Sequence, residues 1–253
     1  MRKINIDKTI QEIQNWIRDY VKNANADGVI VCVSGGVDSA VILTLCVKAL
    51  GKEKITALIL PCQSQPQDEI DAKLVLDMFE VKHYRFDLTP IYLEFLKVTE
   101  KEIKGNMLSN ANIKPRLRMI TAYFIGQSLE NHLVVGTGNR TEDAIGYFTK
   151  YGDGGVDFLP IGDLYKCEVR KLAKKLKIPE TIVNKPPSAG LWKGQTDEGE
   201  IGLTYDDLDE IIYRIDHNKD LTDINQDKLV KVQKMMKSSE HKIKEIPKLI
   251  IKE

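Results

Sequence analysis

The sequence predicts an α/β protein: a doubly wound parallel sheet of about five strands flanked by helices, with a helical C-terminal part. Short apolar runs alternate with helical segments through the first half of the chain. Two of those runs end in loops that contain glycine and acids, SGGVDSA and GTGNRTED. With 253 residues, the chain can bury one large core, and we expect residues 1–253 to form a single domain.

The first helical segment is amphipathic and precedes a strand. Asp7 can cap its N-terminus, and Gly28 ends it. The apolar residues that share one face at helical spacing are Ile10, Ile13, Ile17, Tyr20 and Val21. The run at 29–33 is rich in β-branched residues, which suits a strand that is buried on both faces.

Three further strand-and-helix units follow. The strands are expected at 55–60, 83–88 and 132–138. The helices are expected at 38–50, 67–80, 90–104 and 115–131. The inward face of the 38–50 helix consists of Val41, Ile42, Leu45 and Ala49, and Gly51 stops this helix.

After residue 145 the composition changes to glycine-rich loops and helices. Helices are predicted at 166–176, 205–215 and 226–239. The first of them has one apolar face, formed by Val169, Leu172, Ala173 and Leu176. The stretch at 184–202 is rich in glycine and proline, and loops this long are uncommon in compact domains unless they are functional. With Trp192 between glycines, it suggests a lid that shields a reactive intermediate from water.

Charge and cysteine content bound the partners and the compartment. Lys+Arg and Asp+Glu both number 37, so net charge gives no reason to expect nucleic acid or a membrane. No apolar run approaches the roughly 20 residues that span a bilayer, and the N-terminus has no signal-peptide core. The four cysteines form no C-x-x-C pair, which favours buried thiols in a reducing cytoplasm.

The loop SGGVDSA suits a polyphosphate. It connects a strand to a helix N-terminus, where backbone N–H groups and the helix dipole favour anions. Gly35 and Gly36 allow close approach of the backbone, and Ser34 and Ser39 add hydroxyl donors. The loop contains no lysine, so it is not the G-x-x-x-x-G-K-[ST] type of phosphate loop.

An aspartate in this loop implies a cation, because Asp38 alone would repel phosphate. Mg²⁺ takes one or two carboxylates together with phosphate oxygens and water. In a parallel sheet the GTGNRTED loop lies at the same edge, so Glu142 or Asp143 could supply the second carboxylate. The alternative is that Ser-Gly-Gly makes a tight turn and Asp38 caps the helix. The complete SGG-x-DS pattern after a buried strand favours the polyphosphate site.

At this point the sequence resembles a known family. SGGVDSA matches the pyrophosphate loop of the N-type ATP pyrophosphatases, which have an adenine nucleotide alpha-hydrolase-like fold and cleave ATP between its α and β phosphates. The later segments are similar to ammonia-dependent NAD⁺ synthetases, in order and to about residue 245. These segments are LVVGTGNRTED, GYFTKYGDGGVDFLPIGDLYK, KPPSAGLW-x-GQTDE, GLTYDDLD and EHK.

The resemblance implies the last step of NAD⁺ biosynthesis. Deamido-NAD⁺ is condensed with ammonia, at the expense of ATP and with Mg²⁺, through a nicotinate acyl-adenylate to give NAD⁺, AMP and pyrophosphate. It also implies a homodimer with the dinucleotide site at the subunit interface. Only 33 residues precede the SGG loop, too few for the glutaminase domain of glutamine-dependent relatives, so we expect free ammonia or a separate ammonia supplier.

The matching positions give the implied site residues. ATP would contact Cys32, Val33, Ser34, Gly35, Gly36, Val37, Asp38, Ser39, Gln67, Thr137, Lys166 and Ser188. Deamido-NAD⁺ would contact Arg116, Lys150, Asp157, His241 and Lys242, and Mg²⁺ would be held by Asp38 and Glu142. The implied catalytic residues are Lys166, which would follow the leaving pyrophosphate, and Asp153, which would take a proton from ammonium. A turn aspartate is an equally good interpretation of Asp153.

The match departs from the family in the loop after the second strand. Many relatives have an arginine just before the LP, where this chain has Ile59, so the ATP contacts of that loop are open. Ala111 replaces a glycine of the family pattern. Arg116 and Arg118 point about 200° apart on a helix, so we expect them to have different roles.

Two other functions remain in view. A different amide-forming or sulfur-transferring pyrophosphatase would share the SGG loop. A module that binds ATP without chemistry is the alternative from another class. Such a module would need neither Glu142 opposite Asp38 nor the long glycine-rich loops.

Overall fold

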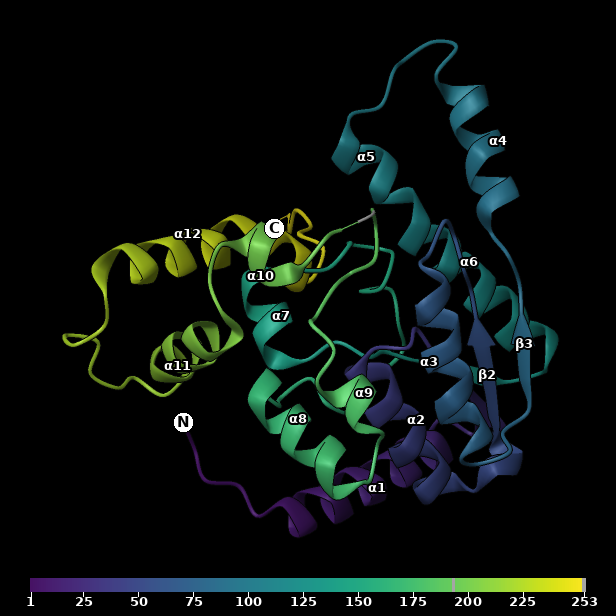
Figure 1. Ribbon diagram of the computed structural model, residues 1–253, viewed down its shortest axis with the longest axis horizontal. Helices are drawn as coiled ribbons and strands as arrows, with labels where there is room; N and C mark the ends of the chain where they lie inside the picture. Colours follow the sequence, from purple (N-terminus) through teal and green to yellow (C-terminus); the bar gives the residue numbers. More distant parts are fainter. Residues whose placement is uncertain (193, 252–253) are drawn as a thin grey trace.

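The computed structural model describes residues 1–192 and 194–251 (Figure 1). Its sheet has four parallel strands in the order β3-β2-β1-β4. The strands are β1 (Gly28–Cys32), β2 (Ile55–Ile59), β3 (His83–Arg85) and β4 (His132–Val135). In register, Val29 of β1 lies opposite Ile55 on one side and Leu133 on the other. The parallel sheet predicted from the sequence is confirmed.

A fifth strand position exists only as a single bridge. Val135 pairs in parallel with Phe158, and the N–H of Gly136 donates to the carbonyl of Phe158 at 2.9 Å. At the opposite edge, β3 has three residues, all of them exposed, where six were predicted to be strand. The sheet is therefore short at both edges.

The helices follow the predicted alternation closely in the first half. Their bounds are α1 (Ile6–Asn23), α2 (Val37–Leu50), the 3₁₀ turn η1 (Lys52–Lys54), α3 (Pro66–Asp77), α4 (Thr89–Thr99), α5 (Met107–Ala111), α6 (Ile113–Ser128), α7 (Arg140–Ile145), α8 (Lys166–Lys175), α9 (Glu180–Val183), α10 (Asp197–Ile201), α11 (Tyr205–Asp216) and α12 (Gln226–Ile243). The short helices α5, α7, α9 and α10 were not predicted from the sequence.

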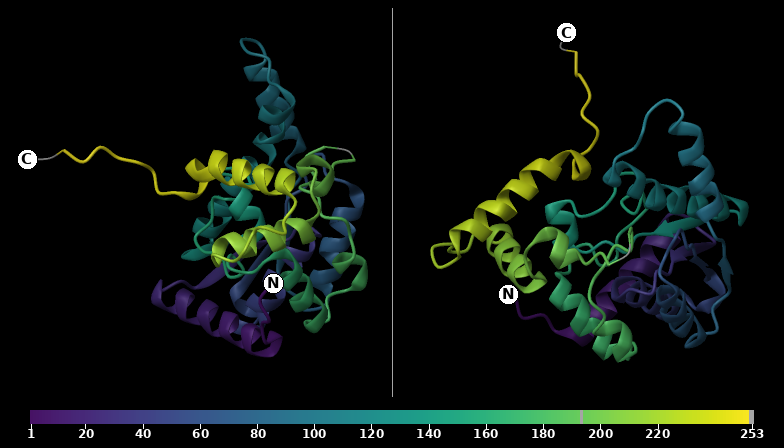
Figure 2. Two further views of the ribbon diagram at one scale, coloured as in Figure 1. Left: turned by 90° about the vertical axis from the view of Figure 1, so that its left-hand side faces the viewer. Right: turned by 45° about the horizontal axis from the view of Figure 1, so that its top comes forward.

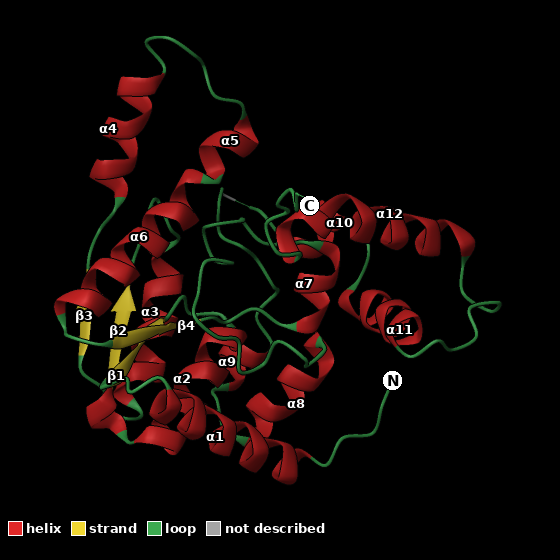
Figure 3. Cartoon of the chain, turned by 180° about the vertical axis from the view of Figure 1, so that it is seen from behind, coloured by secondary structure: helices red, strands yellow, loops and turns green. Residues whose placement is uncertain are grey.

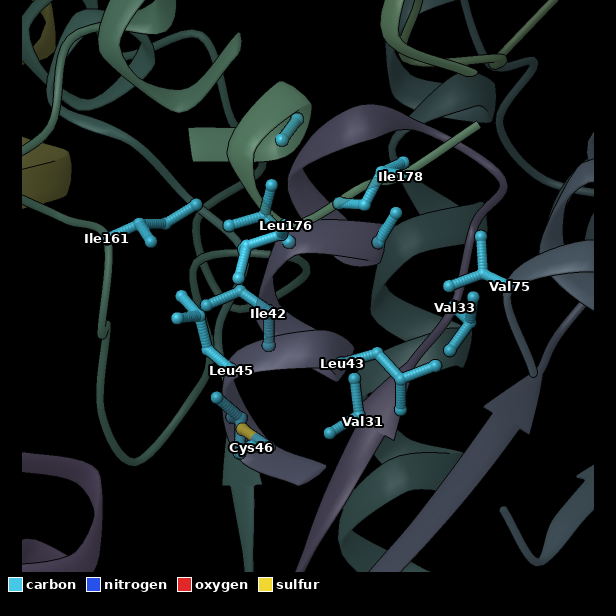
Figure 4. Close-up of a cluster of buried hydrophobic side chains, with 14 of the residues drawn as sticks. Val31, Val33, Ile42, Leu43, Leu45, Cys46, Val75, Ile161, Leu176 and Ile178 are labelled. Carbon is cyan, nitrogen blue, oxygen red and sulfur yellow. The ribbon is translucent and has the colours of Figure 1, made fainter. Parts of the chain in front are cut away.

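Helices cover both faces of the sheet, because successive strand residues point to opposite sides. Val31 packs in a core with side chains of α1, α2, α3 and α8, and Figure 4 shows part of this core with Val31, Ile42 and Leu176. Ile30 packs on the other face, with Tyr92 of α4 and Ala122 of α6. The predicted inward faces of the 38–50 and 166–176 helices are buried.

The C-terminal helices have a core of their own, beside the sheet rather than on it. Leu208, Ile212, Leu229 and Val232 of α11 and α12 pack with Ile145 of α7. Figure 3 shows α7, α10, α11 and α12 together, away from the strands, and Figure 2 shows the chain after α12 leading away from the body. This arrangement confirms the predicted helical C-terminal part.

Three local predictions were wrong. Asn5, rather than Asp7, caps α1, because its side chain accepts from the N–H of Lys8 at 3.1 Å. Tyr20 is 37% exposed, and its hydroxyl donates to the carbonyl of Asp157, so it is not a core residue. The helix predicted at 90–104 ends at Thr99.

The four cysteines are free thiols, of which Cys46 and Cys62 are buried and Cys32 and Cys167 are half-buried. Burial raises the pKa of Cys32 to about 11 and that of Cys46 to about 12, so neither is a ready nucleophile. In the residues that the structure describes, no helix combines the length and apolar character that crossing a bilayer requires.

The fold predicts different outcomes for alanine at two glycines with the same left-handed conformation, Gly146 (φ 65°) and Gly202 (φ 69°). A Cβ on Gly146 would lie 2.1 Å from the Cβ of Ser239 in α12, whereas one on Gly202 would meet only the mobile tip of Lys231. Both variants carry the backbone strain, but Gly146→Ala should lose about 2 kcal/mol more, from overpacking. Urea unfolding measures the difference, and equal losses would contradict the close packing of α7 on α12.

Candidate active site

The loop between β1 and α2 is shaped for an anion. Gly35 has φ 81°, and a Cβ there would lie 2.3 Å from the carbonyl oxygen of Asp68, so only glycine fits. Ser39 Oγ accepts from the N–H of Ser34 and donates to the carbonyl of Gly36. Gly36 is the N-cap of α2 and supplies no side-chain cap, so the first-turn N–H groups of this helix remain available to a ligand.

Among the other loop positions predicted to contact ATP, Val33 and Val37 have buried side chains and Cys32 is half-buried. Val33 donates its own N–H to the carbonyl of Leu58 within the sheet. Only backbone groups of Val33 and Val37 could therefore meet a ligand.

Asp38 does not cap α2, and its carboxylate instead meets the second glycine-bearing loop. Its Oδ1 accepts from Asn139 Nδ2 at 2.9 Å, and its Oδ2 lies 2.6 Å from Lys166 Nζ. The same ammonium lies 2.8 Å from Glu142 Oε1. The two loops are adjacent, as predicted from the parallel sheet. Of the two acids proposed as partner of Asp38, Glu142 faces it, while Asp143 lines a cavity.

Because Asp38, Glu142 and Lys166 are close together and shielded from water, the charge of each strongly affects the pKa of its neighbours. Burial lowers the pKa of Lys166, but Asp38 and Glu142 raise it by more, so this lysine stays charged. Burial raises the pKa of Glu142 to about 7, the charges of Asp38 and Asp197 add to the rise, and Lys166 opposes it. Two carboxylates thus share one ammonium, which leaves an excess of negative charge when both are ionised.

The two carboxylates are ligands of the kind that Mg²⁺ binds. Asp38 and Glu142 already converge on a common cation, the Lys166 ammonium. Within residues 1–192 and 194–251, no group of three or more His, Cys, Asp or Glu side chains gathers as a closed metal cage. An open pair of carboxylates is what a magnesium ion that also binds phosphate and water requires.

Asp209 of α11 fixes Lys166 at the start of α8. Its Oδ2 accepts from the N–H of Cys167 at 2.7 Å, and its Oδ1 accepts from the hydroxyl of Thr141 at 2.5 Å. That hydroxyl oxygen in turn accepts from the N–H of Lys166 at 3.0 Å. The helix that presents the lysine is therefore anchored from two other helices.

Tyr205, which no sequence argument singled out, completes the cluster. It is 1% exposed, and its ring lies 4.9 Å from Lys166 Nζ. Its hydroxyl lies 3.1 Å from Glu142 Oε1 and 2.9 Å from Asp197 Oδ2. Asp197 and Tyr205 lie in the family-like segments GQTDE and GLTYDDLD, respectively. Nothing in the neighbouring sequence indicates which residue either of them contacts.

Four of the five residues predicted to contact deamido-NAD⁺ form one surface between α6, the loop after α7 and α12. Arg116 donates to the carbonyl of Lys150, and Lys150 Nζ donates to the carbonyl of His241. Lys242 Nζ donates to the carbonyls of Gly146 and Phe148. The fifth, Asp157, uses its carboxylate within the fold, accepting from Tyr123 Oη and the N–H of Val134.

A cavity of about 200 Å³ lies between the phosphate loops and this surface. Its lining includes Thr137, Glu142, Asp143, Asp153 and Lys242. The carboxylate of Asp153 accepts from the N–H of Thr149 at 3.0 Å. Burial raises the pKa of Asp153 and raises that of Asp143 to about 6. Asp153 as a whole residue is exposed.

Lys185 and Gly190, from the segment predicted to be a lid, lie against the start of α3, beside the SGG loop. Lys185 Nζ binds the carboxylates of Asp68 and Asp71, and Gln67 donates to Asp71 at 2.8 Å. Exposed Ser188 donates to the carbonyl of Gln195. Gln67 and Ser188, both predicted to contact ATP, therefore come from segments beside the SGG loop. Residue 193, within the predicted lid, lies outside the described residues.

Arg116 and Arg118 have different partners, as predicted. Arg118 donates to the carbonyl of Leu60 at 3.0 Å and to Ser64 Oγ at 3.3 Å. Those residues belong to the loop after β2, the loop whose ATP contacts the sequence left open. A guanidinium therefore does reach this loop, but from α6.

Fold and site together define an α/β protein whose candidate site lies at the carboxyl edge of a parallel sheet. An uncapped helix N-terminus follows the first strand, and a pair of carboxylates faces it at the carboxyl edge of the sheet.

Comparison with known proteins specifies the family. The model of the NAD synthase family matches residues 9–246. The NH₃-dependent NAD⁺ synthetase of Carboxydothermus hydrogenoformans is 45% identical over 98% of this chain and 100% of its own length. That of Archaeoglobus fulgidus is 44% identical over 96% of each chain. The chain therefore belongs to the NAD synthase family, and it is a ligase.

Solved structures agree with this assignment. An NMN synthetase from Francisella tularensis has a TM-score of 0.89 and 36% identity, covering 98% of this chain and 100% of that one. An NH₃-dependent NAD synthetase from Campylobacter jejuni, in complex with nitrate, has a TM-score of 0.84 and 29% identity over the same shares.

The raised pKa of Glu142 predicts a pH dependence of stability. Its ordinary value of 4.5 rises to about 7 on folding, so the folded protein binds more protons in this window and stability falls as pH rises. Glu142→Gln should remove about 2 kcal/mol of that fall in metal-free buffer, as measured by urea unfolding from pH 4.5 to 7.5.

The control for this prediction is Glu240→Gln. Lys244 lowers the pKa of Glu240, so that variant should not flatten the profile. An unchanged slope in Glu142→Gln would show that the carboxylate is not desolvated.

Proposed function

We propose that this chain catalyses the ATP-dependent amidation of deamido-NAD⁺ by ammonia, giving NAD⁺, AMP and pyrophosphate through a nicotinate acyl-adenylate. The observation that carries the proposal is the meeting of Asp38 and Glu142 beside the uncapped N-terminus of α2. Membership of the NAD synthase family and relatives named for the same reaction support it.

Activation of the carboxylate is a matter of alignment and charge. A carboxylate is a poor electrophile, so the nicotinate carboxylate first attacks the α-phosphorus of ATP and releases pyrophosphate. The protein must hold the two groups in line and stabilise the charge that develops on the leaving oxygens. The N–H groups at the start of α2 and the exposed hydroxyl of Ser34 lie where they can do so.

Mg²⁺ would be held by Asp38 and Glu142, and when bound it would neutralise charge on the phosphates. Lys166 shares those carboxylates, so its ammonium lies beside the phosphate site. A charged lysine is a compact donor for phosphate oxygens and suits the leaving pyrophosphate.

The cavity provides the place where ammonia attacks the acyl-adenylate. It touches residues assigned to ATP, such as Thr137, and residues assigned to the dinucleotide, such as Lys242. Ammonium has no lone pair, so an acceptor must take its proton. Asp153 lines the cavity, and burial raises its pKa, which strengthens it as a base.

A mononucleotide acceptor is a second candidate. The observation in its favour is the similarity to the NMN synthetase from Francisella tularensis. The chemistry at the carboxylate would be the same, and the two substrates would differ only in whether an adenylate occupies the surface of Arg116 and Lys150.

An assay of purified protein tests the reaction. With ATP, Mg²⁺, ammonium and deamido-NAD⁺, we expect NAD⁺ and AMP in equal amounts. Asp38→Asn should lower the rate at least roughly 100-fold, because even outer-shell partners of metal sites are worth 10- to 100-fold. Asp163→Asn, at an exposed carboxylate, should retain the wild-type rate.

ADP in place of AMP would refute the proposal, and so would near-normal turnover in Asp38→Asn. Nicotinate mononucleotide offered at equal concentration distinguishes the two acceptors. Faster formation of NMN than of NAD⁺ would favour the second candidate.

We also propose a cytoplasmic homodimer that uses free ammonia. The free thiols suit a reducing compartment. Large apolar side chains are more than half exposed on neighbouring helices, Met107 and Leu108 on α5 and Ile120 and Phe124 on α6. A second copy of the chain would cover such a surface.

Sedimentation equilibrium at micromolar protein tests the dimer. The wild type should have twice the 28.7 kDa chain mass, and Phe124→Asp should shift it toward the monomer. Leu249→Asp, at an apolar and even more exposed position in the C-terminal segment, is the control and should remain dimeric. A monomeric wild type would refute this assembly.

A further inference from the structure

Asp197, the first residue of α10, holds both neighbours of Ser188. Its N–H donates to the carbonyl of Pro187 at 3.0 Å, and its Oδ1 accepts from the N–H of Ala189 at 3.0 Å. Asp197 is only 4% exposed, whereas Ser188 is exposed. One buried aspartate, through its backbone N–H and its carboxylate, therefore holds both neighbours of the residue assigned to ATP.

The other oxygen of that carboxylate leads to the cation site. Asp197 Oδ2 lies 2.9 Å from the hydroxyl of Tyr205, and the same hydroxyl lies 3.1 Å from Glu142 Oε1. Tyr205 is 1% exposed, so water does not compete for its hydroxyl. Figure 1 shows α10 beside α7, the helix that carries Glu142.

A phenol has one proton, so Tyr205 can donate to only one of these carboxylates at a time. In the arrangement seen here Glu142 also accepts from Lys166, and it competes with Asp197 for the hydroxyl. Any positive charge added at Glu142 makes it a weaker acceptor, and the tyrosine proton then goes to Asp197. That hydrogen bond fixes the orientation of the Asp197 carboxylate, which also accepts from the N–H of Ala189, the residue after Ser188.

We infer that Tyr205 and Asp197 are positioning residues that couple the ATP-contacting loop around Ser188 to the cation-holding carboxylate of Glu142. This inference rests on the proposed function, which assigns Ser188 to ATP and Glu142 to Mg²⁺. Its consequence is that each ligand strengthens binding of the other beyond their direct contact, and the effect must be reciprocal.

Calorimetry of ATP binding, without deamido-NAD⁺ and with either Mg²⁺ or EDTA, measures the coupling as a ratio of two affinities. The direct contact between Mg²⁺ and ATP is common to all variants and cancels when they are compared. Tyr205→Phe keeps the ring and should lower the ratio about tenfold, because a hydrogen bond to a charged group is lost. Its ATP affinity in EDTA should stay within about twofold of the wild type.

Asp197→Asn gives an independent test of the same link. Asparagine has one acceptor oxygen, which can take the place of the oxygen that faces Ala189 or of the oxygen that faces Tyr205 but not of both, so the ratio should fall by a similar factor. The double variant should lose no more than either single variant, because both changes break one connection. Additive losses would overturn the inference.

Tyr213→Phe is the matched control, on the same helix. Tyr213 packs against the ring of Tyr165, and its hydroxyl makes no hydrogen bond within the described part of the chain. It should retain the wild-type ratio, and circular dichroism confirms that each variant is folded. If Tyr205→Phe does not fold, Asp197→Asn decides alone.

The outcomes separate the inference from the proposed function. NAD⁺ formation by the wild type, together with an unchanged ratio in Tyr205→Phe or in Asp197→Asn, would overturn the inference alone. A wild type that binds no ATP would overturn both.

Discussion

The rest of the structure depends on one buried ammonium between two carboxylates. Lys166 comes from the start of α8, Asp38 from the start of α2 and Glu142 from α7, the helix after β4. A buried charge is costly unless it is paired and hydrogen-bonded, so the three elements must keep one relative arrangement. Asp209 and Tyr205 on α11 extend this requirement to the C-terminal helices. The sheet and the C-terminal core are thus joined through charge as well as through apolar packing.

The same interaction makes the site responsive to its substrates. Asp38 and Glu142 together carry more charge than the single ammonium of Lys166 can balance. Burial raises the pKa of Glu142, and the charge of Asp38 adds to this rise. A cation beside the carboxylates would remove that imbalance. Phosphate at the open N-terminus of α2 would offer Lys166 a second set of acceptors. A cluster that is stable without ligands can therefore exchange partners when nucleotide and cation bind, and no new charge has to be buried without compensation.

The C-terminal helix α12 forms one side of the cavity in which ammonia would attack in the proposed mechanism. Lys242 at the end of α12 binds the carbonyls of Gly146 and Phe148, which closes one side of the cavity. Because Asp153 and Asp143 line the same cavity and both have raised pKa values, a cation that enters meets carboxylates of increased basicity. In the proposed mechanism, proton transfer would then occur in this cavity rather than in bulk solvent.

The sequence by itself determined the parallel sheet, the helices on both of its faces and the meeting of two acidic loops at one edge. Burial of a strand on both faces demands an unbroken apolar run, and parallel strands bring their carboxyl ends together. The tertiary structure decided which side chains meet there. Asp197 and Tyr205 lie far along the chain from Glu142, and Asn5 displaced Asp7 as the cap of α1. Local periodicity encodes burial and backbone preference, but the packing of helix on helix selects which donor reaches which carboxylate.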